Sequence, residues 1–138
     1  MITMQLNSRT LAFDKEKTKI YQEKNCHCCD CQACRNYYKS IENNKLLKEL
    51  LSSFGLSYLL PEEIIWFSLD DKEDSLIHYE AYYGVEGNFD GEEFSIEDCN
   101  VKIDFRKEVN LLQDIPTNYF WIVVNKNFPY ILSQERDI

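Results

Sequence analysis

Five of the six cysteines in this chain lie within nine consecutive residues, in the run from Cys26 to Cys34. They are Cys26, Cys28, Cys29, Cys31 and Cys34, and they form three overlapping C-x-x-C pairs. The packing of a hydrophobic core does not explain such a high density of thiols. The chemistry of thiolates, as metal ligands or redox groups, explains it readily. Because each C-x-x-C loop can present two sulfur atoms to one ion, the run predicts a metal site or a redox site.

Zinc is the metal expected first, because it binds thiolates in a tetrahedron of four ligands. The candidate ligands are the five clustered cysteines and His78, and His27 and Cys99 are further residues of the right type. A structural zinc site usually takes two ligands from each of two separated loops, whereas these cysteines are contiguous. Soft thiolates also suit Cu(I) or an iron–sulfur centre. The simpler interpretations make His78 a surface residue beside Glu80 and Cys99 a small buried apolar residue.

The same cysteines are candidates for redox chemistry, in which Cys31 and Cys34 or a neighbouring pair would cycle through a disulfide. If Cys34 lies in the first turn of a helix, the helix dipole should lower the pKa of its thiol. A permanent disulfide framework is less expected, because a cytoplasmic thiol pool is kept reduced. Local packing without further function is the remaining alternative.

The chain has the size and composition of one folded domain, with 138 residues, 44% of them hydrophobic and 14% aromatic. Its net charge of −9 is uneven, since residues 1–50 carry nine Lys and Arg against six acidic residues and the remainder carries six against eighteen. An acidic surface repels nucleic acid and anionic membranes and predicts a basic protein partner. The sequence has no signal-peptide pattern at its start and no run of roughly 18 apolar residues, so we expect a cytoplasmic protein.

Hydrophobic periodicity predicts helices in the middle of the chain. Residues 35–54 have helical spacing, which Asn43 and Asn44 interrupt, so two short helices are favoured. Gly55 should end the second helix, because glycine readily adopts the left-handed conformation that follows a last turn. Residues 64–67 fit a helical turn and a strand equally well.

Strands are predicted near the start of the chain and throughout its second half. Residues 1–25 indicate one or two short strands, and from residue 76 the apolar residues alternate with period two. The run Tyr119–Val124 is apolar on both faces, as a central strand is, and residues 129–132 fit an edge strand after a turn at Lys126-Asn127.

These elements predict an α+β fold class, with a Cys-rich N-terminal segment and one or two helices packed on an antiparallel β-meander of three to five strands. We expect a single domain over residues 1–138. Its parts are a Cys-rich loop at 26–34, a helical region at 35–54 and an antiparallel sheet at 76–133.

The stretch from Cys29 to Tyr37 resembles the C-x-C-x-x-C-x-N-Y signature of a group of uncharacterised small cytoplasmic proteins from Firmicutes. The leucine-rich helix before Phe54-Gly55-Leu56, the strand with His78-Tyr79 and the strand from Tyr119 to Lys126 also match. The resemblance implies no substrate. It marks as important the positions Cys29, Cys31, Cys34, Asn36 and Tyr37, and Cys26 and Cys28 are additions to the signature.

The function expected first is that of a non-enzymatic cytoplasmic module for protein binding or regulation, with a Cys-rich loop stabilised by zinc. One alternative is a thiol redox protein or sensor, and another is a toxin-neutralising immunity-type protein, by analogy of size and acidity. The sequence has no Ser-His-Asp set, glycine-rich phosphate loop or H-E-x-x-H motif, so an enzyme that pairs a cysteine with His78 rests on residue types alone.

Overall fold

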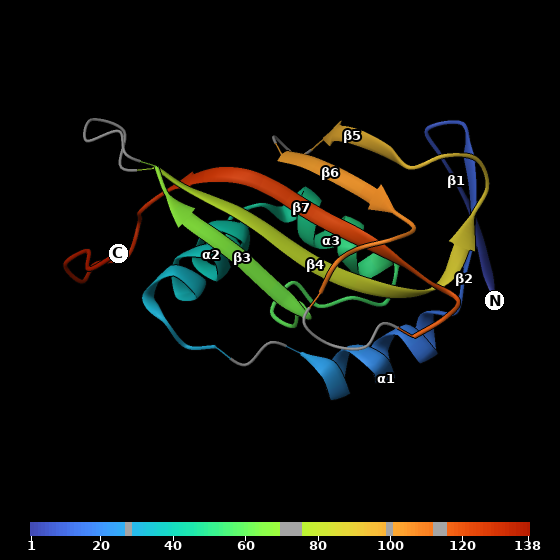
Figure 1. Ribbon diagram of the computed structural model, residues 1–138, viewed down its shortest axis with the longest axis horizontal. Coiled ribbons are helices and arrows are strands. Elements are labelled where there is room, and N and C mark those ends of the chain that lie inside the picture. The colour runs from blue at the N-terminus through green and yellow to red at the C-terminus, as the bar shows by residue number, and fades with distance from the viewer. Residues whose placement is uncertain (27–28, 70–75, 99–100, 112–115) are drawn as a thin grey trace.

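The computed structural model describes residues 1–26, 29–69, 76–98, 101–111 and 116–138. These residues form three helices and a seven-stranded antiparallel sheet, so the predicted α+β class is confirmed (Figure 1). The elements in chain order are β1 (Ile2–Leu6), β2 (Arg9–Phe13), α1 (Lys15–Asn25), α2 (Gln32–Glu42), α3 (Lys45–Ser53), β3 (Glu63–Ser68), β4 (Leu76–Phe89), β5 (Phe94–Asp98), β6 (Val101–Arg106) and β7 (Tyr119–Pro129).

The strands lie in the order β1-β2-β4-β7-β6-β5, and β3 pairs with the first half of β4. β7 therefore lies between β4 and β6, and the expectation that Tyr119–Val124 forms a central strand is confirmed. The expected turn at Lys126-Asn127 and the edge strand at 129–132 are wrong. The ladder with β4 continues without a break to the pair Leu76 and Pro129, because β4 is long enough to pair with all of β7.

The main core lies between the sheet and the helices α2 and α3, which are behind the sheet in Figure 1. β4 contributes alternate residues to this core, as the period of two predicts. The fully buried members from this strand are Ile77, Tyr79, Ala81, Tyr83 and Val85. Residues 64–67, which fitted two structures equally well, lie in the strand β3.

Side-chain caps mark the helix boundaries. Asn44 accepts a hydrogen bond from the Leu47 N–H at 3.1 Å and begins α3, and Gly55 follows this helix with φ +86°. The interruption predicted between two helices is thus confirmed. α2 begins at Gln32, three residues before the predicted boundary, so Cys34 lies inside the helix. The predicted strands near the start are β1 and β2, and α1 was not predicted.

A second, smaller core lies on the other face of the sheet, where α1 packs. Tyr21 of α1 lies against Trp121 and Gly84, and a Cβ atom at Gly84 would be 3.0 Å from the Trp121 ring and 3.1 Å from the Tyr21 ring. The Tyr21 hydroxyl donates a hydrogen bond to Oε1 of Glu62 at 2.7 Å. The other carboxylate oxygen of Glu62 is buried and has no hydrogen-bond partner among the described residues.

We expect Glu62→Gln to stabilise the protein at neutral and higher pH. Burial raises the pKa of Glu62 above its ordinary value of 4.5, although the Tyr21 hydrogen bond opposes this rise. Because the folded chain holds this proton more tightly than the unfolded chain, the carboxyl group lowers the free energy of unfolding as the pH rises from about 4.5. The variant should gain about 1 kcal/mol at pH 8 and almost nothing at pH 4.

Urea unfolding at pH 4, 6 and 8 measures this difference. Glu80→Gln, at a half-buried position of β4, is the matched control for the loss of one negative charge, because Glu80 does not contribute to the raised pKa of Glu62. A Glu62→Gln variant that is less stable than the parent protein at pH 8 would contradict the prediction.

Candidate metal centre

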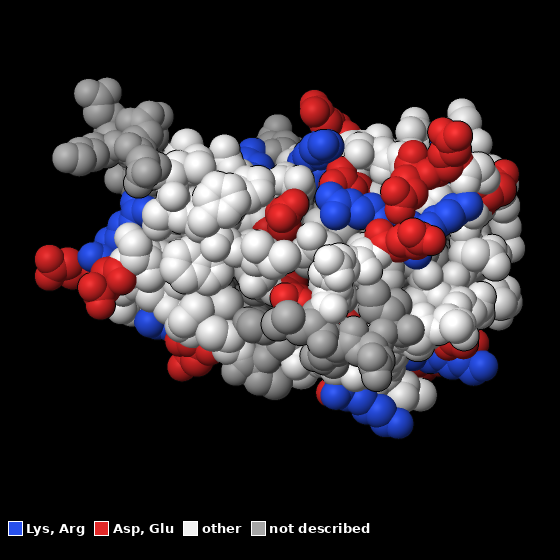
Figure 2. Space-filling view, viewed as in Figure 1, with Lys and Arg blue, Asp and Glu red and all other residues white. Residues whose placement is uncertain are grey.

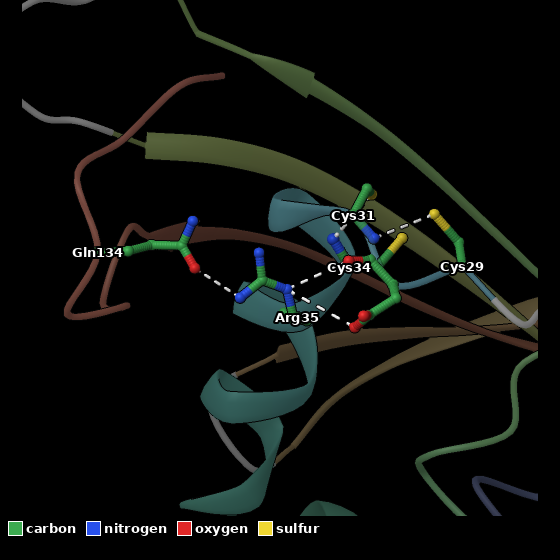
Figure 3. A network of polar contacts seen from close by, with 6 residues as sticks. Cys29, Cys31, Cys34, Arg35 and Gln134 are labelled. Atoms are coloured by element: carbon green, nitrogen blue, oxygen red, sulfur yellow. Dashed lines mark hydrogen bonds and ion pairs between the residues drawn. The ribbon is translucent and has the colours of Figure 1, made fainter.

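Three cysteines at the start of α2 bring their sulfur atoms together. The Sγ atoms of Cys29, Cys31 and Cys34 all lie within 4.8 Å of one another (Figure 3). In a tetrahedral zinc site the ligand sulfur atoms are about 3.8 Å apart, because each Zn–S bond is about 2.3 Å long. A movement of about 1 Å would therefore suffice for the three thiolates to bind one ion.

Local backbone geometry positions these sulfur atoms. Cys31 is the N-cap of α2, and its Sγ accepts the backbone N–H of Cys34 at 3.4 Å. The N–H of Cys31 in turn donates to Sγ of Cys29, also at 3.4 Å. Backbone N–H groups that point at sulfur favour its charged form, and the N-terminal end of a helix adds a positive partial charge. The C-x-C-x-x-C spacing thus produces a ligand loop that continues directly into the helix.

The three thiols differ in burial and in pKa. Burial alone would raise the pKa of Cys31, but hydrogen bonds from the Cys34 backbone, from Cys29 and from Ala33 lower it overall. For Cys34, burial strongly raises the pKa, and the neighbouring sulfur atoms of Cys31 and Cys29 add to this rise. The predicted fall of the Cys34 pKa is therefore wrong. The residue is only 1% exposed, and this loss of solvation outweighs the helix dipole.

Among the described residues, two of the other predicted ligands, Cys26 and His78, lie outside this group. Cys26 follows α1 and places its Sγ 4.0 Å from the carbonyl oxygen of Glu23. Cys28, like His27 and Cys99, lies outside the described residues.

His78 also requires a correction as a predicted ligand. Its neighbour Tyr79 faces α2, so His78 points to the opposite face of β4, where its Nδ1 lies 2.7 Å from Oδ1 of Asn127. The ring of His78 also packs against Phe67, with the ring centroids 4.8 Å apart. The sheet therefore separates His78 from the three thiols.

Tyr79 of β4 holds the cysteine loop, by which we mean residues 29–34, through a hydrogen bond from the sheet. Its hydroxyl donates to the carbonyl oxygen of Ala33, between Cys31 and Cys34, at 2.6 Å, and it accepts a bond from Nδ2 of Asn36 at 3.3 Å. Burial raises the pKa of Tyr79, so the hydroxyl stays protonated and donates at neutral pH. A sheet residue thereby fixes the part of the backbone that carries the cysteines.

Sequence reasoning missed the residues that join this loop to the end of the chain. Arg35 donates from Nε to the carbonyl oxygen of Asp30 at 3.2 Å and from Nη1 to Oε1 of Gln134 at 2.6 Å. Asn36 was marked only by the resemblance. The sequence does contain one signal for Asn36, because this polar amide residue lies on the apolar face of the helix together with Ala33 and Tyr37.

Comparisons with known proteins add no relative. No family model, no curated protein and no solved structure matches this chain. The resemblance to the uncharacterised Firmicutes proteins therefore stays a prediction. Among the helices that the structure describes, none combines the length and the apolar composition needed to cross a lipid bilayer.

Proposed function

We propose that Cys29, Cys31 and Cys34 hold a structural zinc ion, and that the protein is a non-enzymatic cytoplasmic module for protein binding or regulation. The observation that carries the proposal is the approach of three sulfur atoms to within 4.8 Å of one another at a helix start. Zinc favours such thiolate sets, and as a tetrahedral ion without redox chemistry it suits a site that orders a loop. A bound cation also offsets the repulsion among three thiolates.

The partner proposed for this module is a basic protein. The support is the net charge of −9, because residues 51–138 carry eighteen acidic residues against six Lys and Arg. Figure 2 shows charged side chains of both signs gathered where β5 and β6 lie, and a mostly uncharged surface over β3, β4 and β7. Ile65 and Phe67 of β3 are exposed there, so an apolar contact with a basic rim is the complementary chemistry.

The metal proposal is tested by elemental analysis and thiol titration of protein purified without a chelator. We expect one zinc per chain, with the three clustered thiols reacting only after denaturation. The same analysis on Cys28→Ser determines whether Cys28 supplies the fourth ligand. A metal-free protein that cannot be loaded with zinc would contradict the proposal.

A redox function is the second candidate, and one observation favours it. Cys31 and Cys34 form a C-x-x-C pair that opens a helix, with Cys31 partly exposed and Cys34 buried. Oxidation would join their sulfur atoms and transfer two electrons and two protons to a disulfide substrate, which would leave as a dithiol. In the thiol titration, this function predicts metal-free protein with a rapidly alkylated Cys31 or a reducible disulfide.

A further inference from the structure

The last nine residues, 130–138, which we call the tail segment, lie against the first two turns of α2. The segment has no helix or strand, and α2 holds it through side chains. Gln32 donates from Nε2 to the carbonyl oxygen of Glu135 at 3.0 Å and accepts the N–H of Asp137 at 2.7 Å. Gln32 thus both donates a hydrogen bond to the backbone of the tail segment and accepts one from it, although the partners are more than 100 positions away in the sequence.

Asn36 makes the corresponding pair of bonds where the tail segment leaves the sheet. Its Nδ2 donates to the carbonyl oxygen of Pro129 at 3.1 Å, and its Oδ1 accepts the N–H of Ile131 at 2.7 Å. Asn36 is itself fully buried, and its two bonds reach the backbone of the exposed residues Pro129 and Ile131. Gln32 and Asn36 lie one turn apart on the same face of α2.

The side chains that hold the tail segment alternate with the proposed zinc ligands. Gln32 lies between Cys31 and Cys34, and Arg35 follows Cys34 directly. Figure 3 shows Arg35 between the two parts, bonded to the cysteine loop on one side and to Gln134 on the other. Tyr79 gives a second connection, since Ala33, Tyr79 and Asn36 form a continuous hydrogen-bond chain.

We infer that the tail segment is a latch, whose docking on α2 is linked to metal binding by Cys29, Cys31 and Cys34. This inference rests on the proposed metal site. The first turn of a helix has few internal hydrogen bonds, so it frays unless its cap is held. An ion on Cys31 and Cys34 holds that turn and keeps Gln32 and Arg35 in place. Without the ion, the turn opens more often, and the tail segment loses its partners.

Linkage makes the effect reciprocal. If zinc strengthens docking of the tail segment by some factor, docking must strengthen zinc binding by the same factor. A variant that weakens docking far from the thiols must therefore weaken zinc binding, although it removes no ligand. Gln32 suits this test because its two bonds go to the tail segment, whereas Arg35 also contacts the cysteine loop.

The experiment combines zinc competition titrations with amide hydrogen exchange at Ile131 and Asp137. In the parent protein, both amides should exchange more slowly with zinc than without it. Gln32→Ala should lower the zinc affinity about fivefold. Asp137→Pro removes the N–H that donates to Gln32, and this variant should also lower the zinc affinity. Asp137→Asn keeps that N–H, and Lys39→Ala lies on the exposed side of α2, so both controls should match the parent protein.

The outcomes separate the latch from the metal site itself. Weaker zinc binding in Gln32→Ala and Asp137→Pro, with unchanged controls, supports the latch. If zinc binds the parent protein but neither variant changes its affinity, and the two amides exchange equally with and without zinc, the latch is overturned and the metal site stands. If the parent protein binds no zinc, both proposals fail together.

Discussion

Cys31→Ser is expected to weaken zinc binding by more than about 100-fold. A loss of up to roughly 100-fold is typical when the removed group only hydrogen-bonds to a ligand, whereas this substitution removes a proposed ligand itself. Cys31 is both a proposed ligand and the N-cap of α2, where its sulfur accepts the Cys34 N–H. Serine is itself a favourable N-cap residue, so the variant keeps the start of the helix. The loss can then be assigned to the missing thiolate and not to an unfolded first turn.

Two measurements check this prediction, namely competition with a chromophoric chelator and thermal unfolding with and without zinc. At a free zinc concentration of 100 times its dissociation constant, zinc should stabilise the parent protein by about 2.7 kcal/mol, and at that concentration it should leave Cys31→Ser almost unchanged. Cys26→Ser is the matched control, because Cys26 lies outside the group of three sulfur atoms. Retention of parental zinc affinity by Cys31→Ser would remove Cys31 from the site.

Asn36→Ala should lower the free energy of unfolding by about 3 kcal/mol. The substitution leaves the carbonyl oxygen of Pro129 and the N–H of Ile131 without their partner, and it removes a donor to Tyr79. A buried polar group left unsatisfied costs about 1 to 3 kcal/mol, and the Asn36 side chain lies at a fully buried position. The melting temperature should fall by about 10 °C.

Thermal and urea unfolding measure this loss. Asn43→Ala, at the end of the same helix, is the control, because Asn43 is exposed and makes one long contact of 3.5 Å to the carbonyl oxygen of Lys39. That variant should stay within about 0.5 kcal/mol of the parent protein. The same small change in Asn36→Ala would show that the bonds between α2 and the end of β7 contribute little to stability.

The fold was predictable where burial is periodic along the chain. The apolar residues of β4 from Ile77 to Val85 recur with period two, and α3 has an apolar stripe with an Asn44 cap and a Gly55 end, so both were recognised from sequence. α1 escaped prediction because its sequence KEKTKIYQEKN has no apolar stripe, and its buried residues are the polar Thr18 and Gln22. What marks its start is the Asp14 side chain, which accepts the Lys17 N–H at 2.9 Å.

The candidate site was predictable in its thiols and not in their surroundings. Short spacing alone brings Cys29, Cys31 and Cys34 together, so the cluster was visible in the sequence. The raised pKa of Cys34 depends on burial under the sheet, which no local pattern records. The bonds from Gln32 and Asn36 to the end of the chain join residues that are 93 to 105 positions apart. Their partners are backbone groups, which every residue type except proline offers in full, so the partner residues have no recognisable type in the sequence.

The central place of β7 also determines when the sheet can be completed during synthesis on the ribosome. β1 and β2 are neighbours in the chain, as are β5 and β6, so each pair can form a hairpin while translation continues. β4 and β6 do not pair with each other; both pair with β7, which lies between them and ends at Pro129. A nascent or prematurely terminated chain that lacks β7 therefore leaves β4 and β6 as open edges, and such edges recruit chaperones or lead to aggregation.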